Sequence, residues 1–300
     1  ERTRMLGDAT LFTREDEVGG DGDEPRSRPP AGLGQVAGGD LVVAARALGL
    51  AFTDLGVGEG GAMDHGIGPR LAQTNKLYAL DMRGHALSEK GPPEGRGNMA
   101  KDVLEFMDQK GIKKAHIGGN SMGGGVTLGM LGLAPERFIT ASFQGSGVGE
   151  TSEWREKTPK DKEGVDVEGQ QASANYRQAR VERGEEVGNN AADFARMQAA
   201  SGAPRQSEEE RKAAQAEMAK RRQAQMDALD LSKIKFPVMA INGEFDRPIA
   251  KTHRLWRELD DFTNLVLPGK GHLSAVMAGV SPQAYIDRCA DFIAANNRRA

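Results

Sequence analysis

Short apolar runs alternate with longer helical stretches along most of this chain, and that alternation restricts its fold more than any other feature. The runs end at turn residues and have the length of buried strands. They are Leu41–Ala45, Leu48–Phe52, Leu77–Leu80, Ala115–Ile117, Phe138–Phe143, Pro237–Ile241 and Asn264–Leu267. Helical patterns occupy Met99–Gln109, Ser121–Leu133 and Pro282–Asn296. Strands that alternate with helices predict an α/β fold with a mostly parallel central sheet and helices on both faces.

Residues 150–230 interrupt this alternation. The stretch is rich in Glu, Arg, Lys, Gln and Ala and has no strand-like run. Ser207 and Glu210 have the S-x-x-E spacing of a capping box, which predicts a helix from there to about residue 229. The apolar stripe of that helix is thin and consists, besides alanine, of Met218, Met226 and Leu229. We interpret the stretch as a helical insertion into the α/β core, which comprises residues 1–149 and 231–300. Within that core, we expect residues 1–40 to be irregular.

Charge and composition exclude several classes of protein. The chain has 40 basic and 43 acidic side chains, a formal net charge of −3 and no long block of like charge, which argues against a nucleic-acid binder. No apolar run approaches the roughly 20 residues of a membrane-spanning helix, and the first residues have no signal-peptide pattern. The single cysteine, Cys289, rules out an internal disulfide and a Cys-rich metal site. We therefore expect a cytoplasmic protein with no membrane partner. The sequence leaves the oligomeric state open, a homo-oligomer included.

The sharpest motif is Gly119-Asn120-Ser121-Met122-Gly123, which follows an apolar run and opens a helical stretch. A G-x-S-x-G string between a strand and a helix predicts a nucleophile elbow, a tight turn that exposes the serine hydroxyl. The flanking glycines are needed because a Cβ at either position would clash with the neighbouring chain. The N–H of Met122 would lie at the helix N-terminus, where unpaired donors and the helix dipole favour an anion.

A serine nucleophile needs a base, and the base needs an orienting carboxylate. His272 follows the last apolar run and is therefore expected on a loop at the carboxyl end of a strand, where open α/β sheets carry their sites. Asp246 follows the preceding run, which gives the order Ser, Asp, His that accompanies the elbow motif. Glu244 is a rival for the role of Asp246 at the same strand end.

Other chemically active side chains have structural interpretations. We expect Arg83 and His85 to brace the loop after their strand, and His116 to pack within the sheet. Cys289 is expected to pack in the final helix as a small hydrophobe. Four large residues of the insertion are candidates either for lining a pocket or for local packing: Trp154, Tyr176, Phe194 and Met197.

Taken together, the segments that carry these residues resemble the α/β-hydrolase superfamily from about Leu48 to the C-terminus. The matching segments are LYALDMRGHALSEK (77–90), HIGGNSMGGG (116–125), APERF (134–138), PVMAINGEFDRP (237–248) and LPGKGHL (267–273), in the order typical of the family. The resemblance implies an α/β-hydrolase fold with Ser121 as nucleophile, His272 as general base and then acid, and Asp246 as the residue that orients it. It also implies that residues 150–230 are the cap that roofs the pocket in many members. No metal or organic cofactor is expected.

The resemblance further implies where an oxyanion would be bound. Family members carry His-Gly at the end of an apolar strand, and the next residue donates the second N–H. The string His65-Gly66-Ile67 fits that pattern, so Met122 and Ile67 are the predicted oxyanion donors. We interpret the strand before His65 as shortened to Gly-Ala-Met-Asp, which would bring Asp64 near a developing negative charge.

A serine at the elbow indicates acyl chemistry, because family members that open epoxides or displace halide use an aspartate there. The sequence therefore predicts hydrolysis of a small-molecule carboxylic ester through an acyl-enzyme on Ser121. The string Gly-Asn-Ser-Met-Gly-Gly also resembles the elbow of C–C bond hydrolases that cleave vinylogous diketones, so a ketone substrate is the first alternative. Asp64 and the shortened strand motivate a second alternative, a slow or non-catalytic ligand-binding homologue. An acyltransferase would share the same residues and differ in excluding water.

Overall fold

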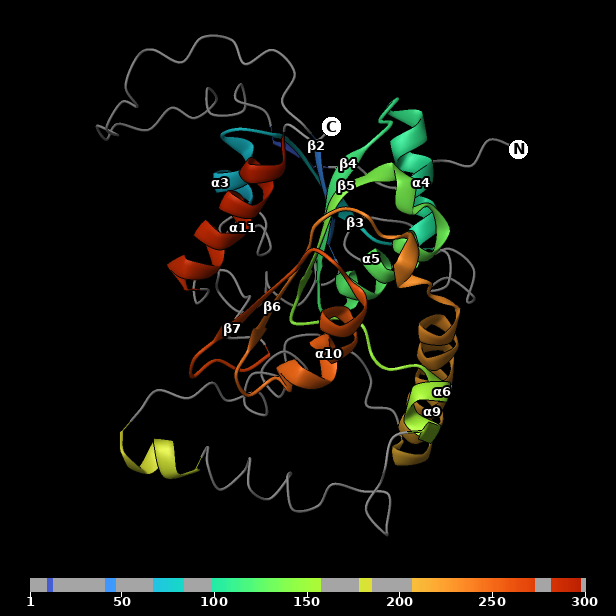
Figure 1. Cartoon of the computed structure of the whole chain (residues 1–300), viewed down its shortest axis with the longest axis vertical. Helices are drawn as coiled ribbons and strands as arrows, with labels where there is room; N and C mark the ends of the chain where they lie inside the picture. Colours follow the sequence, from blue (N-terminus) through green and yellow to red (C-terminus); the bar gives the residue numbers. More distant parts are fainter. Residues whose placement is uncertain are drawn as a thin grey trace.

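The computed structural model describes residues 10–12, 41–46, 67–83, 99–157, 178–184, 207–272 and 282–297. Within these residues a seven-stranded sheet has the order β1-β3-β2-β4-β5-β6-β7 (Figure 1). The strands are β1 (Thr10–Phe12), β2 (Leu41–Arg46), β3 (Lys76–Asp81), β4 (Ala115–Asn120), β5 (Phe138–Gln144), β6 (Val238–Gly243) and β7 (Phe262–Leu267). β1 runs antiparallel to β3, and every other neighbouring pair is parallel. The predicted α/β fold with a mostly parallel sheet is confirmed.

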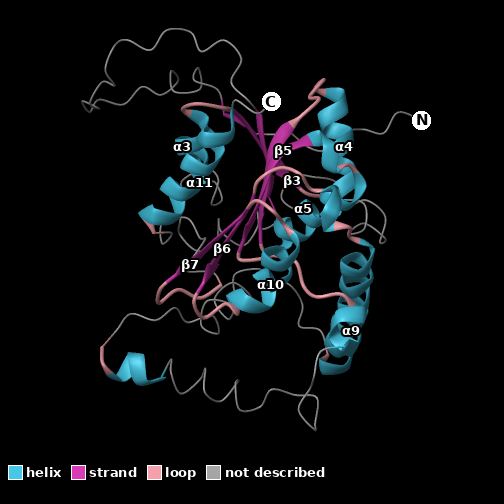
Figure 2. Ribbon diagram, viewed as in Figure 1, coloured by secondary structure: helices cyan, strands magenta, loops and turns pink. Residues whose placement is uncertain are grey.

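Helices cover both faces of the sheet (Figure 2). α3 (Ile67–Ala72) and α11 (Gln283–Asn296) lie on one face, and α4 (Met99–Gln109), α5 (Met122–Leu133) and α10 (Pro248–Glu258) lie on the other. Strand β6 shows how the core is divided: Val238 and Ala240 pack toward α4 and α5, whereas Met239 and Ile241 pack toward α3 and α11. Alternate residues of a strand point to opposite faces, so an unbroken apolar run fills both halves of the core.

Of the two N-terminal strands, β1 corrects the sequence interpretation and β2 confirms it. β1 lies within residues 1–40, which were expected to be irregular; a three-residue strand is too short to show any periodicity in sequence. β2 lies between β3 and β4, with Ala45 aligned with Gly119 beside the elbow. It contains the predicted run Leu41–Ala45. The segment Gly-Ala-Met-Asp at 61–64, interpreted as a shortened strand, lies outside the described residues. The predicted run Leu48–Phe52 lies outside the described residues.

The described parts of residues 150–230 are helical. They comprise α6 (Ser152–Lys157), a helical turn at 178–182 and α9 (Glu208–Ala228). α9 begins at the predicted capping box: Glu210 N donates to Ser207 Oγ at 3.1 Å, and Ser207 N donates to the Glu210 carboxylate at 2.9 Å. Met226 and Leu229 are buried as predicted, whereas Met218 is half exposed because only the C-terminal end of α9 reaches the core. None of the described helices is both long and apolar enough to cross a membrane.

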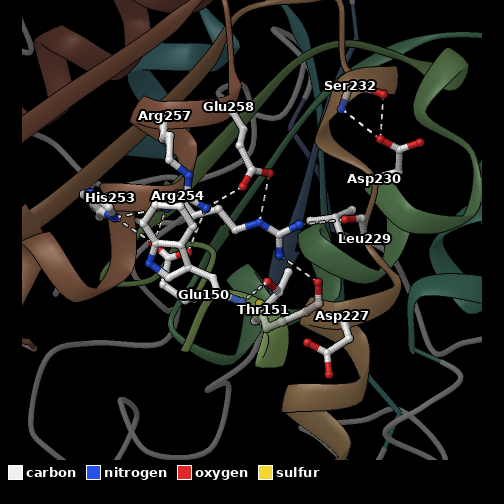
Figure 3. A network of polar contacts seen from close by, with 12 residues as sticks. Glu150, Thr151, Asp227, Leu229, Asp230, Ser232, His253, Arg254, Arg257 and Glu258 are labelled. Atoms are coloured by element: carbon white, nitrogen blue, oxygen red, sulfur yellow. Dashed lines mark hydrogen bonds and ion pairs between the residues drawn. The ribbon is translucent and has the colours of Figure 1, made fainter. Parts of the chain in front are cut away.

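Helix α10 holds both ends of this insertion (Figure 3). Arg257 donates from Nη1 and Nη2 to the two carboxylate oxygens of Glu150, at 3.0 and 2.8 Å. Arg254, which is buried, donates to the carbonyl oxygens of Met226 at 2.7 Å and Leu229 at 2.8 Å. The first of these contacts lies just before α6 and the second at the end of α9. Residues 150–230 therefore leave and rejoin the core against one helix, and their role as a cap remains a prediction.

Candidate active site

Ser121 occupies a strained turn between β4 and α5. Its φ is 52°, and among the described non-glycine residues only Arg247 shares a positive φ. Such a conformation costs free energy and persists where the surrounding structure enforces it. Here Ser121 N donates to Gln144 O at 2.8 Å, and a Cβ on Gly119 would lie 2.1 Å from the carbonyl of Gly123. The two motif glycines therefore allow the strand and the helix to meet closely enough to form the turn.

His272 lies between Ser121 and Asp246. Its Nε2 is 2.8 Å from Ser121 Oγ, and its Nδ1 is 2.7 Å from Asp246 Oδ2. The three residues follow β4, β6 and β7, and their side chains meet at the carboxyl edge of the parallel sheet. The side chains of His272 and Asp246 are only 14% and 11% exposed, which shields their hydrogen bond from water. The structure thus brings together the three residues that the sequence predicted as catalytic.

Glycine is required where the ring of His272 passes the end of β5. Gly145 has a φ of 60°, and a Cβ at this position would lie 3.2 Å from His272 Cε1. The ring therefore packs directly on the backbone of the β5 loop. This contact and the bond to Asp246 restrict the orientation of the imidazole.

The rival carboxylate, Glu244, has other partners. Its Oε2 accepts the N–H of Gly269 at 2.7 Å and pairs with the guanidinium of Arg180. Glu244 thus fixes the loop that follows β7, the loop that carries His272, and ties it to the helical turn at 178–182. Its position near Asp246 in sequence gave no indication of this separate role.

The two predicted oxyanion donors, Met122 and Ile67, begin two different helices. Met122 is the first residue of α5, so its N–H belongs to the first turn, which has no intrahelical acceptor. Ile67 is the first residue of α3, and its side chain packs with Leu71 and Leu77 in the core on the α3 side. His65 and Gly66 lie outside the described residues, and the role of Ile67 as a donor stays a prediction.

Three of the side chains that were expected to have structural roles, Arg83, His116 and Cys289, lie within the described residues. Arg83 pairs with Asp102, so it braces the loop after β3 against α4. His116 is buried in β4 within 2.8 Å of Thr140 Oγ1, and burial lowers its pKa to about 4. Cys289 is buried in α11, and burial raises the pKa of its thiol. His85, Tyr176, Phe194 and Met197 lie outside the described residues.

Trp154 has a packing role at the base of the insertion. The guanidinium carbon of Arg257 lies 3.5 Å from the centroid of its ring, and the ring of His253 lies 6.0 Å away. The His253 imidazole in turn contacts Glu150 at 2.7 Å. Trp154 therefore belongs to the network in which α10 holds the start of the insertion.

Sequence reasoning missed Lys251. Its Nζ lies 2.5 Å from Asp246 Oδ2, the same oxygen that contacts His272. The sequence pattern around Asp246 did not single out Lys251. The contact forms because α10 begins two residues after Asp246 and Lys251 lies in its first turn. Among the described residues, no group of three or more His, Cys, Asp or Glu side chains could hold a metal ion.

Comparison with known proteins supports the architecture. The family described as "alpha/beta hydrolase fold" matches residues 56–275. Among solved structures, the one titled "Est816 as an N-Acyl homoserine lactone degrading enzyme" superposes with a TM-score of 0.55, at 20% identity, over 85% of this chain and 93% of that one. At this identity the likeness concerns the fold alone.

Three curated relatives are more similar in sequence but over shorter segments. The dihydrolipoyllysine-residue acetyltransferase component of the acetoin cleaving system of Pseudomonas putida is 34% identical over 48% of this chain and 40% of its own length. Esterase YbfF of Escherichia coli K12 is 34% identical over 23% of this chain and 27% of its own. The 2-hydroxymuconate semialdehyde hydrolase of Pseudomonas putida is 33% identical over 31% of this chain and 38% of its own. The chain thus spans well under half the length of each of these relatives.

Proposed function

Because the chain belongs to the α/β-hydrolase fold family, we propose that it is a serine hydrolase that cleaves a carboxylic ester through an acyl-enzyme on Ser121. One observation carries the proposal: an unbroken series of contacts from Ser121 Oγ through His272 to Asp246 at the carboxyl edge of the sheet. A hydroxyl, an imidazole and a carboxylate in this geometry constitute an activated nucleophile.

In the proposed reaction, Ser121 Oγ attacks the ester carbonyl carbon while His272 Nε2 takes the hydroxyl proton. The carbonyl oxygen becomes an oxyanion and accepts a hydrogen bond from Met122 N–H at the start of α5. His272 then gives its proton to the departing alcohol, which leaves an acyl ester on Ser121. A water molecule, deprotonated by His272, attacks that ester and releases the acid. Throughout, Asp246 holds Nδ1–H and stabilises the imidazolium.

The insertion supplies the proposed cap over this site. Residues 150–230 begin and end against α10, and Arg180 within them pairs with Glu244 beside the loop that carries His272. A helical segment tied to the core at these points would limit the access of substrate and water to Ser121.

A C–C bond hydrolase acting on vinylogous diketones is the second candidate. The string Gly119-Asn-Ser-Met-Gly-Gly124 and the similarity to a 2-hydroxymuconate semialdehyde hydrolase both favour it. The same residues would serve a reaction in which a ketone carbonyl, in place of an ester carbonyl, is attacked. The first-mentioned relative is an acetyltransferase component by name, so acyl transfer to a thiol belongs among the reactions to test.

The decisive test is labelling of Ser121 with a fluorophosphonate, followed by intact-mass measurement. We expect a single adduct on the wild type and none on Ser121→Ala, with Ser232→Ala as a control for an exposed serine outside the site. Turnover of an aryl ester, of a dienoic diketone, and of an acyl thioester with a dithiol acceptor is measured before and after this labelling. Ester turnover should fall by about 10⁴-fold or more in Ser121→Ala. A folded wild type that takes no adduct and turns over none of the substrates would instead support a ligand-binding homologue.

A further inference from the structure

Lys251 contacts the carboxylate of Asp246 from within the first turn of α10. Its Nζ lies 2.5 Å from Asp246 Oδ2 and donates to Gly145 O at 3.0 Å. His272 Nδ1 contacts the same Oδ2 at 2.7 Å. A single carboxylate oxygen therefore has two donors, one on the imidazole and one on an ammonium group.

The backbone of Lys251 is held as firmly as its side chain. Val148 N donates to Lys251 O at 2.8 Å, and a Cβ on Gly147 would lie 2.1 Å from that oxygen. Helix α10 and the loop after β5 therefore meet without intervening side chains. The same loop contains Gly145, which packs on the ring of His272. Lys251 thus contacts Asp246 with its side chain and, with its backbone, the loop that packs on His272.

The surroundings of Lys251 make this contact stronger than a surface ion pair. Its side chain is 15% exposed, and burial lowers its pKa below the usual lysine value while the Asp246 carboxylate opposes that shift. Arg247, the residue before α10, and Arg222 on α9 add positive charge around the ammonium. Glu244, two residues before Asp246, pairs with Arg180. Asp246 is therefore the anion that keeps Lys251 in this position.

We propose that Lys251 is a positioning residue, one that fixes the Asp246 carboxylate by contacting Oδ2, the oxygen that His272 Nδ1 also contacts. The effect of Lys251 on catalysis rests on the proposed hydrolase function. The ammonium group offsets part of the negative charge that Oδ2 presents to the imidazole, so its removal should let Asp246 stabilise an imidazolium more strongly. Loss of Lys251 should therefore change the pH dependence of the proposed reaction.

The test compares wild type with Lys251→Gln, Lys251→Met and Lys251→Arg. Gln keeps a donor for Gly145 O without the charge, Met removes both, and Arg keeps the charge. Lys235→Gln is the matched control, because it removes a lysine charge from an exposed pair with Asp260. Folding of each variant is checked by circular dichroism. The titration midpoint of His272 is followed by NMR of ¹⁵N-histidine-labelled protein, with His272→Gln to assign its signal, and kcat/KM for an aryl ester is recorded over the same pH range.

We expect the His272 midpoint, and with it the acidic limb of kcat/KM, to rise by about one pH unit in Lys251→Gln and Lys251→Met. Lys251→Arg and Lys235→Gln should match the wild type. Midpoints that coincide in all variants would overturn the proposal, even if Gln and Met slow the reaction, since loss of rate alone indicates a structural role. The NMR readout does not need turnover: a shifted midpoint in a protein without esterase activity would sustain the role of Lys251 and refute the proposed function.

Discussion

Helix α5 begins at a strained serine and is buried along most of its length, whereas α9 begins at a complete capping box and is exposed along most of its length. α5 has no side-chain hydrogen bond at its N-cap, and its residues include five glycines, which are poor helix formers. α9 is rich in Glu, Lys, Arg, Gln and Ala, which are good helix formers, and Met226 is its one described residue that is buried. The two helices therefore derive their stability from different sources.

The difference shows which helix serves the site. α5 forms because β4, β5 and α4 enclose it, and that enclosure is what enforces the conformation of Ser121. α9 forms from local sequence, and its connection to the core is concentrated at its C-terminal end, where Arg254 donates to the carbonyl oxygens of Met226 and Leu229. Changes to buried contacts should therefore have large effects on the free energy of unfolding, and changes along the exposed length of α9 should have small ones.

The largest effect should follow removal of the contact that holds α9. Arg254→Met leaves the buried carbonyls of Met226 and Leu229 without their donor, and we expect a loss of about 3 kcal/mol in the free energy of unfolding. Arg221→Met, on the exposed face of α9, removes only an i,i+4 pair with Glu217 and should cost less than about 0.5 kcal/mol. Urea denaturation measures both values. Equal losses would mean that α9 is held along its whole length.

A comparable effect on the free energy of unfolding should follow from protonation of His116, which lies on β4, the strand that leads into α5. Burial lowers the pKa of His116 to about 4, below its value of about 6.5 in the unfolded chain. Between these values the unfolded state binds a proton that the folded state does not, so stability falls as the pH is lowered from 6.5 to 4, by up to about 3 kcal/mol from this group. His116→Gln removes the titration, and its denaturation curves should lose that part of the pH dependence. An unchanged dependence would contradict the assignment.

A smaller effect should distinguish two adjacent glycines of α5. In Gly124→Ala the new methyl group would lie 2.5 Å from Ser146 Cβ, so the helix and the β5 loop must separate, at a cost of about 2 kcal/mol. Gly125→Ala points into open space and should stabilise the protein by about 0.5–1 kcal/mol through higher helix propensity. Thermal and chemical denaturation of the pair measure the difference. If both variants behave alike, packing does not decide the stability of α5.

The smallest effect should come from the cap of α9. Ser207→Ala removes the acceptor of Glu210 N and should cost about 1 kcal/mol, while Ser207→Asp restores an acceptor and should recover most of it. Hydrogen exchange in the first turn of α9 is the most direct measurement, since the change is local. A loss that spreads to the exchange of β4 and α5 would show that the two helices are coupled after all.

The sequence predicted the elements whose own residues determine them. The helix Met99–Gln109 was predicted with its observed bounds, because its apolar periodicity and flanking residues are local signals. The start of α9 was predicted from Ser207 and Glu210 for the same reason. β1 was missed, because it is short and its pairing with β3 joins residues that are distant in sequence.

The sequence by itself determined the alternating α/β order, the elbow around Ser121 and a short set of partners for it. A tight strand–turn–helix connection requires glycine at particular positions, and that requirement is visible in the residues themselves. Only the tertiary structure decided that Asp246 rather than Glu244 contacts His272, that α10 holds both ends of the insertion, and that Lys251 shares Asp246 Oδ2. These contacts depend on how separate loops meet at one edge of the sheet, and the direction of a side chain across such a junction is set by packing, which no local pattern records.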